Sequence, residues 1–259
     1  MPTSAKCWAK PGRCPTETPA PVDAVPLHIG IVGCSAEGAA LCYRTVCLEG
    51  ADHLGLHGHP EVSLHSHGLA DYVACLEASD LQGVADLMLS SARKLAAAGA
   101  DFLICPDNTI HQAMGLVQPL SPLPWLHIAD VVADEAHRRG FRRLGITGTR
   151  WLVDSSVYPD KLTARGLEYA RPTVEERAAI DHIIMDELVR GVITPDAAAC
   201  FHRVFGRMRE HGCDAVVLGC TEIPLVMSDA NSPLPTLDST RLLARAALEK
   251  ACGAVRAAA

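Results

Sequence analysis

The chain has 259 residues, of which 49% are hydrophobic and 20% charged, and its 30 acidic and 23 basic side chains give a formal net charge of −7. This composition is typical of a water-soluble globular protein with one large α/β domain or two smaller ones. Phosphate neutralisation needs a concentrated basic surface, which this acidic chain lacks, so we expect no nucleic-acid partner. We expect no membrane span either, because the longest apolar stretches have only the length of a strand.

The cysteines and the N-terminal segment indicate the expected cellular location of the protein. There are 11 cysteines, an odd number, and most lie within apolar or helical stretches, so they do not predict a disulfide scaffold. Residues 1–26 are rich in proline and lack the continuous apolar stretch of a secretory signal. We therefore predict a disordered leader on a cytoplasmic protein.

Strand-like and helical stretches alternate along residues 27–128, which we predict to be a first α/β half-domain. Apolar residues recur every three or four positions before Gly99, which is typical of a helix that ends at a glycine. The expected strands are 28–32, 61–65, 101–104 and 124–128, and the expected helical stretches are 37–48 and 69–98.

The same order of elements recurs in residues 129–237, the predicted second half-domain. The segment 28–34 matches 143–149, and Cys105 and Cys220 both end a Gly-x-Asp-apolar strand. Alternating strands and helices predict parallel sheets, with functional residues at the carboxyl ends of the strands. The expected strands are 143–147 and 214–218, and the expected helices are 130–139, 172–190, 195–211 and a last one at about 238–255 that packs back on the first half.

Two of the cysteines, Cys105 and Cys220, are expected to meet in a cleft between the halves. Both lie where a strand turns into a polar segment, unlike cysteines that merely fill a core. Opposed thiols suit proton transfer at a carbon acid, because a thiolate can remove a Cα proton on one face while a thiol returns one on the other. Neighbouring helix N-termini would bind the substrate carboxylate and favour the thiolate. Such a reaction requires no cofactor.

Four segments in this order resemble the aspartate/glutamate racemase family, whose members are cofactor-independent two-thiol amino-acid racemases. The resemblance implies two pseudo-symmetric half-domains, each a parallel-sheet α/β sandwich, with the active site in the cleft between them and a homodimer as the assembly. The segments are IGIVGCSAE at 29–37, CPDNTIH at 105–111, GITGTR at 145–150 and LGCTEI at 218–223.

The resemblance also implies roles for individual residues. Cys105 and Cys220 correspond to the paired acid/base thiols, one for each enantiomer, and Lys161 resembles a lysine near the substrate's side-chain carboxylate. His111 and Glu222 are expected to support the thiols. The expected donors to the substrate carboxylate are Ser35, Asn108, Thr109, Thr149 and Thr221.

Some features depart from the family's pattern or have two interpretations. The first loop reads Gly-Cys-Ser-Ala at 33–36, which changes the pocket, and Cys34 is a candidate lining residue. Asp107, in an altered loop, either faces the substrate ammonium group or caps the following helix. Arg150 either clamps a carboxylate or lies on the surface. For the histidines at 53, 57, 59, 65 and 67 we favour surface or pocket positions over a metal site, because their spacing lacks a metal-binding pattern.

The leading hypothesis is a cofactor-independent racemase that inverts the α-carbon of aspartate, glutamate or a related acidic amino acid. The alternatives are an isomerase or decarboxylase of a small carboxylic acid within the same superfamily, a hydantoin racemase, and a catalytically silent carboxylate-binding protein. The expected partner is a small-molecule carboxylate or amino-acid substrate.

Overall fold

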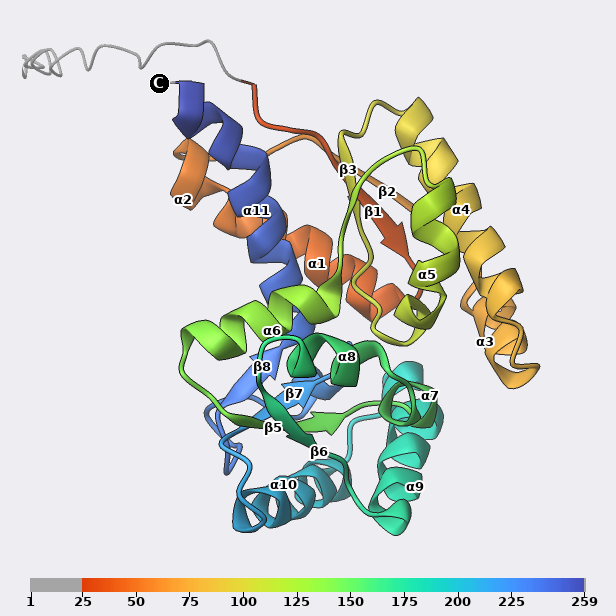
Figure 1. Cartoon of the computed structure of the whole chain (residues 1–259), viewed down its shortest axis with the longest axis vertical. Helices are drawn as coiled ribbons and strands as arrows, with labels where there is room; N and C mark the ends of the chain where they lie inside the picture. Colours follow the sequence, from red (N-terminus) through yellow and green to blue (C-terminus); the bar gives the residue numbers. More distant parts are fainter. Residues whose placement is uncertain (1–24, 259) are drawn as a thin grey trace, which may run out of the picture.

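The computed structural model describes residues 25–258, so residues 1–24 of the predicted leader lie outside the described residues. The chain forms two lobes, each built around a parallel four-stranded sheet (Figure 1). The two sheets have the same strand order, β2-β1-β3-β4 in the first and β6-β5-β7-β8 in the second. The predicted α/β architecture of two similar halves is therefore confirmed.

The strands of both sheets are short, and the four inner ones are buried along almost their whole length. The first sheet contains β1 (Ile29–Gly33), β2 (Val62–Ser66), β3 (Phe102–Ile104) and β4 (Trp125–Leu126); the second contains β5 (Arg143–Thr147), β6 (Glu168–Ala170), β7 (Ala215–Leu218) and β8 (Thr236–Asp238). Strands β1, β3, β5 and β7 are the inner strands, so their carboxyl ends lie near the middle of each sheet edge.

Helices cover both faces of each sheet. The first lobe carries α1 (Ala36–Glu49), α2 (Ala51–Leu54), α3 (Leu69–Glu77), α4 (Leu81–Ala97) and α5 (Met114–Val117). The second carries α7 (Arg150–Asp154), α8 (Val157–Thr163), α9 (Val174–His182) and α10 (Pro195–Glu210), while α6 (Ile128–Arg138) and α11 (Ser239–Ala258) connect the lobes. No helix within residues 25–258 is long and apolar enough to cross a membrane.

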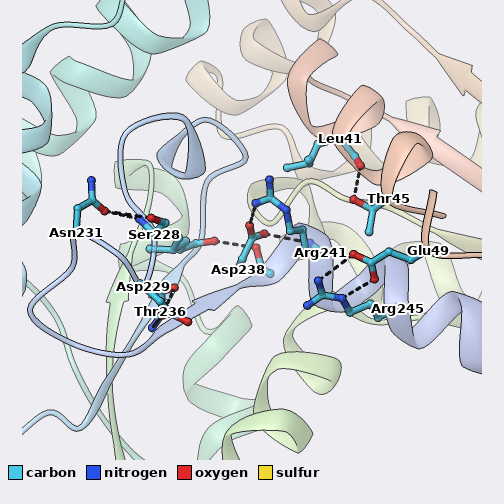
Figure 2. Close-up of polar contacts among 12 residues, drawn as sticks. Leu41, Thr45, Glu49, Ser228, Asp229, Asn231, Thr236, Asp238, Arg241 and Arg245 are labelled. Carbon is cyan, nitrogen blue, oxygen red and sulfur yellow. Dashed lines mark hydrogen bonds and ion pairs between the residues drawn. The ribbon is translucent and has the colours of Figure 1, made fainter. Parts of the chain in front are cut away.

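Helix α11 returns from the second lobe to the first. Its apolar side packs with α1 against β1 and β3, where Leu243, Ala247 and Leu248 lie in one core with Ile29 and Ile31. An ion pair fastens the two helices at their exposed edge, with Arg245 Nε 2.7 Å from Glu49 Oε2 (Figure 2). The last helix therefore holds the two lobes in a fixed relation.

Helix α6 also belongs to both lobes. Ile128 lies in the core of the first sheet, whereas Ala129 and Val132 lie in the core of the second. The helix begins at Ile128 because the side chain of His127 accepts a hydrogen bond from the Ala129 N–H, which caps the first turn. This cap shortens the strand expected at 124–128 to β4, and the half-domain boundary predicted at residue 128 falls at the start of this shared helix.

The single helix expected over 172–190 is interrupted. A capping box formed by Thr173 and Glu176 starts α9, which is followed by a π-helical turn at Ile183–Glu187 and a 3-10 turn at Leu188–Arg190. Gly191, in the left-handed conformation at φ 73°, ends the segment. The π turn breaks the 3.6-residue period and, as π turns often do, lies beside a cavity.

Candidate active site

Four loops, each following an inner strand, converge on one cavity between the lobes. They follow β1, β3, β5 and β7, in agreement with the rule that parallel sheets bind ligands at the carboxyl ends of their strands. The cavity encloses about 510 Å³ of space, its open mouth included. The polar residues that line it are Cys34, Ser35, Asp107, Asn108, Thr109, Thr149, Cys220, Thr221 and Glu222.

Cys220 follows β7 and faces this cavity with a polar partner beside it. Its Sγ donates a hydrogen bond to Glu222 Oε2 at 2.9 Å, and the hydroxyl of Thr221 donates to the same oxygen at 2.7 Å. Burial and the Glu222 carboxylate raise the pKa of the Cys220 thiol well above its ordinary value. Without substrate the thiol is therefore protonated at neutral pH.

Hydroxyl groups join the two lobes across the cavity. Ser35 Oγ lies 2.9 Å from Thr221 Oγ1, and Thr109 Oγ1 lies 2.9 Å from Thr149 Oγ1. Ser35 and Thr149 are also the N-caps of α1 and α7. The side chain of Thr221 also packs closely on α1, since a Cβ added to Gly38 would lie 2.5 Å from Thr221 Cγ2.

Asn108, from the first lobe, is held by hydrogen bonds to the second lobe and to the first residue of α11. Its Nδ2 donates to Ser239 Oγ at 2.9 Å, and the hydroxyl of the fully buried Tyr158 donates to its Oδ1 at 2.6 Å. These bonds fix the start of the loop that contains Thr109. The expected carboxylate donors are thus gathered in one place: Ser35, Asn108, Thr109, Thr149 and Thr221 all line the cavity.

His111 supports the loop after β3 from behind. Its Nδ1 donates to the Asp107 carbonyl at 2.7 Å, and its Nε2 accepts from the Ile128 N–H at 3.4 Å. Burial lowers the pKa of His111 well below its ordinary value, so the ring is neutral, which fits one donating and one accepting nitrogen. His111 is not among the described residues that line the cavity.

The structure places two further predicted site residues, Cys105 and Lys161, away from the cavity wall. Cys105 is fully buried, and its Sγ contacts the Asp107 carbonyl oxygen at 3.8 Å. The Lys161 ammonium pairs with Asp130 Oδ2 of α6 at 2.8 Å. Neither residue is among those described as lining the cavity.

Asp107 forms a cap and also lies on the cavity wall. One carboxylate oxygen accepts from the Ile110 N–H at 3.2 Å, so the side chain caps the turn after β3, and the same residue lines the cavity. Burial raises the pKa of Asp107 to about 6; the Glu222 charge adds to this effect, while hydrogen bonds from the Ile110 N–H and the Cys34 thiol oppose it.

An apolar wall completes the cavity, and the sequence reasoning did not anticipate it. Its members come from α3, from Ile110 in the turn after β3, from Trp151 in α7 and from the π turn with the residues after it. No Lys, Arg or His is among the described residues that line the cavity. The wall is formed by Leu69, Tyr72, Val73, Leu76, Ile110, Trp151, Ile184, Met185 and Val189.

Arg150 and His65, whose roles the sequence left undecided, do not line the cavity. Arg150 pairs with Asp181 at 3.5 Å and lies over the Trp151 ring at 4.4 Å, outside the cavity lining. His65 bonds to Ser91 at 2.9 Å. Within residues 25–258 no three His, Cys, Asp or Glu side chains gather as metal ligands would.

Known proteins share both the sequence pattern and the fold. A family described as Asp/Glu/Hydantoin racemase matches residues 30–247. Among solved structures, a candidate Asp/Glu racemase from Yersinia pestis is 29% identical (TM-score 0.79; 87% of this chain and 99% of that chain). PH1733, an aspartate racemase homologue from Pyrococcus horikoshii OT3, is 26% identical (TM-score 0.74; 86% and 98%). The broad specificity amino-acid racemase RacX of Bacillus subtilis (strain 168) is 24% identical over 162 residues, which are 61% of this chain and 68% of RacX. This chain therefore belongs to the Asp/Glu/hydantoin racemase family.

Proposed function

We propose that this protein is a cofactor-independent racemase that inverts the α-carbon of an amino acid. The observation that carries the proposal is the cavity itself, where the Cys220 thiol lies beside hydroxyl groups contributed by both lobes. A thiol can exchange a proton with Cα, and fixed hydroxyl donors can hold the substrate carboxylate whose negative charge would otherwise oppose carbanion formation.

The binding of the amino acid follows from the charges around the thiol. Thr109 and Thr149, whose hydroxyl groups lie side by side, supply short donors for the carboxylate group of the substrate. Glu222 supplies a buried acceptor for its ammonium group. A bound ammonium group would also offset the Glu222 charge that raises the pKa of Cys220, so substrate binding would ease formation of the thiolate.

The apolar wall favours a substrate with an uncharged side chain. The family resemblance alone predicts aspartate or glutamate, whose second carboxylate would need a cation or several donors once buried. The lining described above offers apolar side chains there and no cation, and Lys161 is paired with Asp130 instead. We therefore place amino acids with apolar side chains ahead of the acidic ones. That the enzyme is a cytoplasmic homodimer stays a prediction from the sequence.

The test is a panel of separate D- and L-amino acids incubated in deuterium oxide and analysed by chiral chromatography and mass spectrometry. We expect inversion with deuterium incorporation at Cα, faster for apolar amino acids than for aspartate or glutamate. Cys220→Ser should abolish inversion, whereas Cys200→Ser, which alters a buried cysteine in the core of the second lobe, should not.

Other outcomes would identify the alternatives. Thermal stabilisation by amino acids without any inversion would indicate a silent carboxylate-binding protein. Release of carbon dioxide from a substituted malonate would indicate a decarboxylase, and a covalent adduct on Cys220 would indicate an isomerase that uses the thiol as a nucleophile. Each of these results in the absence of racemisation would refute the proposed function.

A further inference from the structure

The two sheets allow the positions after β3 and β7 to be compared residue by residue. Strands β1 and β5 match along their length, with Gly30 at the place of Gly145. In the first sheet Gly30 pairs with Leu103, and in the second Gly145 pairs with Val216. Leu103 and Val216 are therefore equivalent positions in the two lobes.

Hydrogen bonds at the start of these strands give the same alignment. The His28 N–H donates to Asp101 Oδ2 at 2.6 Å, and the Arg143 N–H donates to Asp214 Oδ1 at 3.1 Å. In return the Asp101 N–H donates to the His28 carbonyl, and the Asp214 N–H to that of Arg143. Asp101 and Asp214 are thus equivalent, and each precedes its paired strand by the same interval.

Counting along the chain from either pair of equivalent positions gives the same correspondence after the strands. Asp107 lies four positions after Leu103, and Cys220 lies four positions after Val216. Cys105 lies at the position of Leu218, a buried strand residue. The symmetry of the fold therefore places Asp107, and not Cys105, opposite Cys220.

The surroundings of the two side chains agree with this pairing. Cys105 belongs to the apolar core of the first lobe together with Leu103, Ile110 and Met114, and is fully buried there. Asp107, by contrast, lines the cavity together with Cys220. A thiol enclosed in the core cannot reach Cα of a bound amino acid, whereas a carboxylate on the cavity wall can.

We propose that Asp107 is the second acid/base group of this enzyme and acts on the face of Cα opposite to Cys220. This inference rests on the proposed racemase function and deepens it, because it replaces the expected thiol pair with a carboxylate and a thiol.

The chemical step balances with these two groups alone. For one enantiomer, the Asp107 carboxylate removes the Cα proton, so the Cα–H bond breaks and an O–H bond forms. The Cys220 S–H bond then breaks as its proton goes to the opposite face of Cα. The product leaves a neutral carboxylic acid and a thiolate, which is the state that converts the other enantiomer by the reverse steps.

In the free enzyme, the local electrostatics favour the state in which Asp107 is ionised and Cys220 is protonated. Around neutral pH Asp107, with a pKa raised by burial to about 6, is mostly ionised, while the raised pKa of Cys220 keeps its thiol protonated. The titratable groups that face Asp107 are Cys34 from the loop after β1, Tyr72 from α3, Cys105 from its own loop, and Cys220 and Glu222 from the loop after β7.

The test compares Asp107→Asn with Cys105→Ala in the full chain, with inversion and α-deuterium wash-out measured separately for each enantiomer of the best substrate. Asn keeps the shape and the capping oxygen of Asp107 but cannot take a proton. We expect Asp107→Asn to lower inversion by about 10²- to 10⁴-fold, and Cys105→Ala to retain inversion within a few fold. Circular dichroism checks that both variants are folded.

The wash-out separates a catalytic role from a structural one. In Asp107→Asn, Cys220 can still exchange the proton of the enantiomer that it faces, so wash-out should persist for that enantiomer and disappear for the other. Loss of wash-out from both enantiomers would overturn the proposal, as would normal inversion by Asp107→Asn or loss of inversion in a folded Cys105→Ala variant. A wild-type enzyme that racemises no amino acid would refute the proposed function itself.

Discussion

Replacing Asp107 by Asn should make the protein more stable at neutral pH while it removes activity. Burial raises the pKa of Asp107 from the ordinary 3.8 to about 6. At about 1.4 kcal/mol for each tenfold change in proton affinity, the ionised carboxylate costs the folded protein about 3 kcal/mol. The Asn amide carries no charge and keeps the acceptor for the Ile110 N–H.

The expected gain is smaller than this cost because the amide must also be buried. Burial of a neutral polar group costs about 1 kcal/mol or more, which leaves a net gain of about 1 to 2 kcal/mol. In a chain of this size the gain corresponds to a rise in Tm of about 4 °C. Asp80→Asn is the matched control, since Asp80 is an exposed cap of α4 that accepts from the Gly83 N–H at 2.8 Å.

The pH dependence gives the sign of the effect. The folded protein binds the Asp107 proton up to about pH 6, whereas the unfolded chain releases it near pH 3.8. Protonation therefore favours folding, and the wild type loses this stabilisation as the pH rises from about 4 to about 6. Thermal and urea unfolding should show Asp107→Asn more stable than wild type at neutral pH, but no more stable than wild type at about pH 4, where Asp107 is uncharged in the folded protein. A variant that is less stable than wild type by the same amount at both pH values would refute this reasoning.

Three further substitutions test the arrangement of the site. Tyr158→Phe removes the donor to Asn108 Oδ1 at 2.6 Å, so we expect a loss of about 1 to 3 kcal/mol in urea unfolding and a higher KM; unchanged stability would contradict the role of this bond. Gly38→Ala introduces a Cβ 2.5 Å from Thr221 Cγ2 and should lower kcat in a folded protein, whereas unaltered kinetics would show that the contact yields freely. Lys161→Ala should leave the KM for apolar amino acids unchanged, and a selective loss of aspartate or glutamate turnover would restore Lys161 as a substrate ligand.

Much of the fold could be predicted because its periodic signals are strong. The strands β1 and β7 are continuous apolar runs, β5 has an apolar centre, and glycines follow the helices that precede β3 and β7. Strands β6 and β8 have only three residues each and lack such a run. They exist because β5 and β7 offer free edges for pairing, which is a tertiary effect that local sequence does not show.

The expected donors could be placed at the candidate site from the sequence because each follows an inner strand or caps a helix. The apolar wall was not, since α3 and the π turn reach the cavity only through tertiary packing. The equivalence of Asp107 and Cys220 could be read from the sequence, because each lies at the same distance from an equivalent aspartate. Six positions separate Asp101 from Asp107, and six separate Asp214 from Cys220. Matching cysteine with cysteine hides this equality, whereas an alignment without gaps reveals it.

A carboxylate and a thiol make the proposed catalytic pair chemically unequal, which two thiols would not be. The free enzyme rests with Asp107 ionised and Cys220 protonated, because its pKa values order the two groups in that way. Conversion of one enantiomer starts from this state, whereas conversion of the other must start from the less populated acid and thiolate. The equilibrium constant of any racemisation is one, so kcat/KM must be equal in the two directions. The chemical difference between the two groups therefore changes kcat and KM for the two enantiomers, but not their ratio. The enantiomer that the Asp107 carboxylate deprotonates binds to an enzyme that is already in the protonation state it needs.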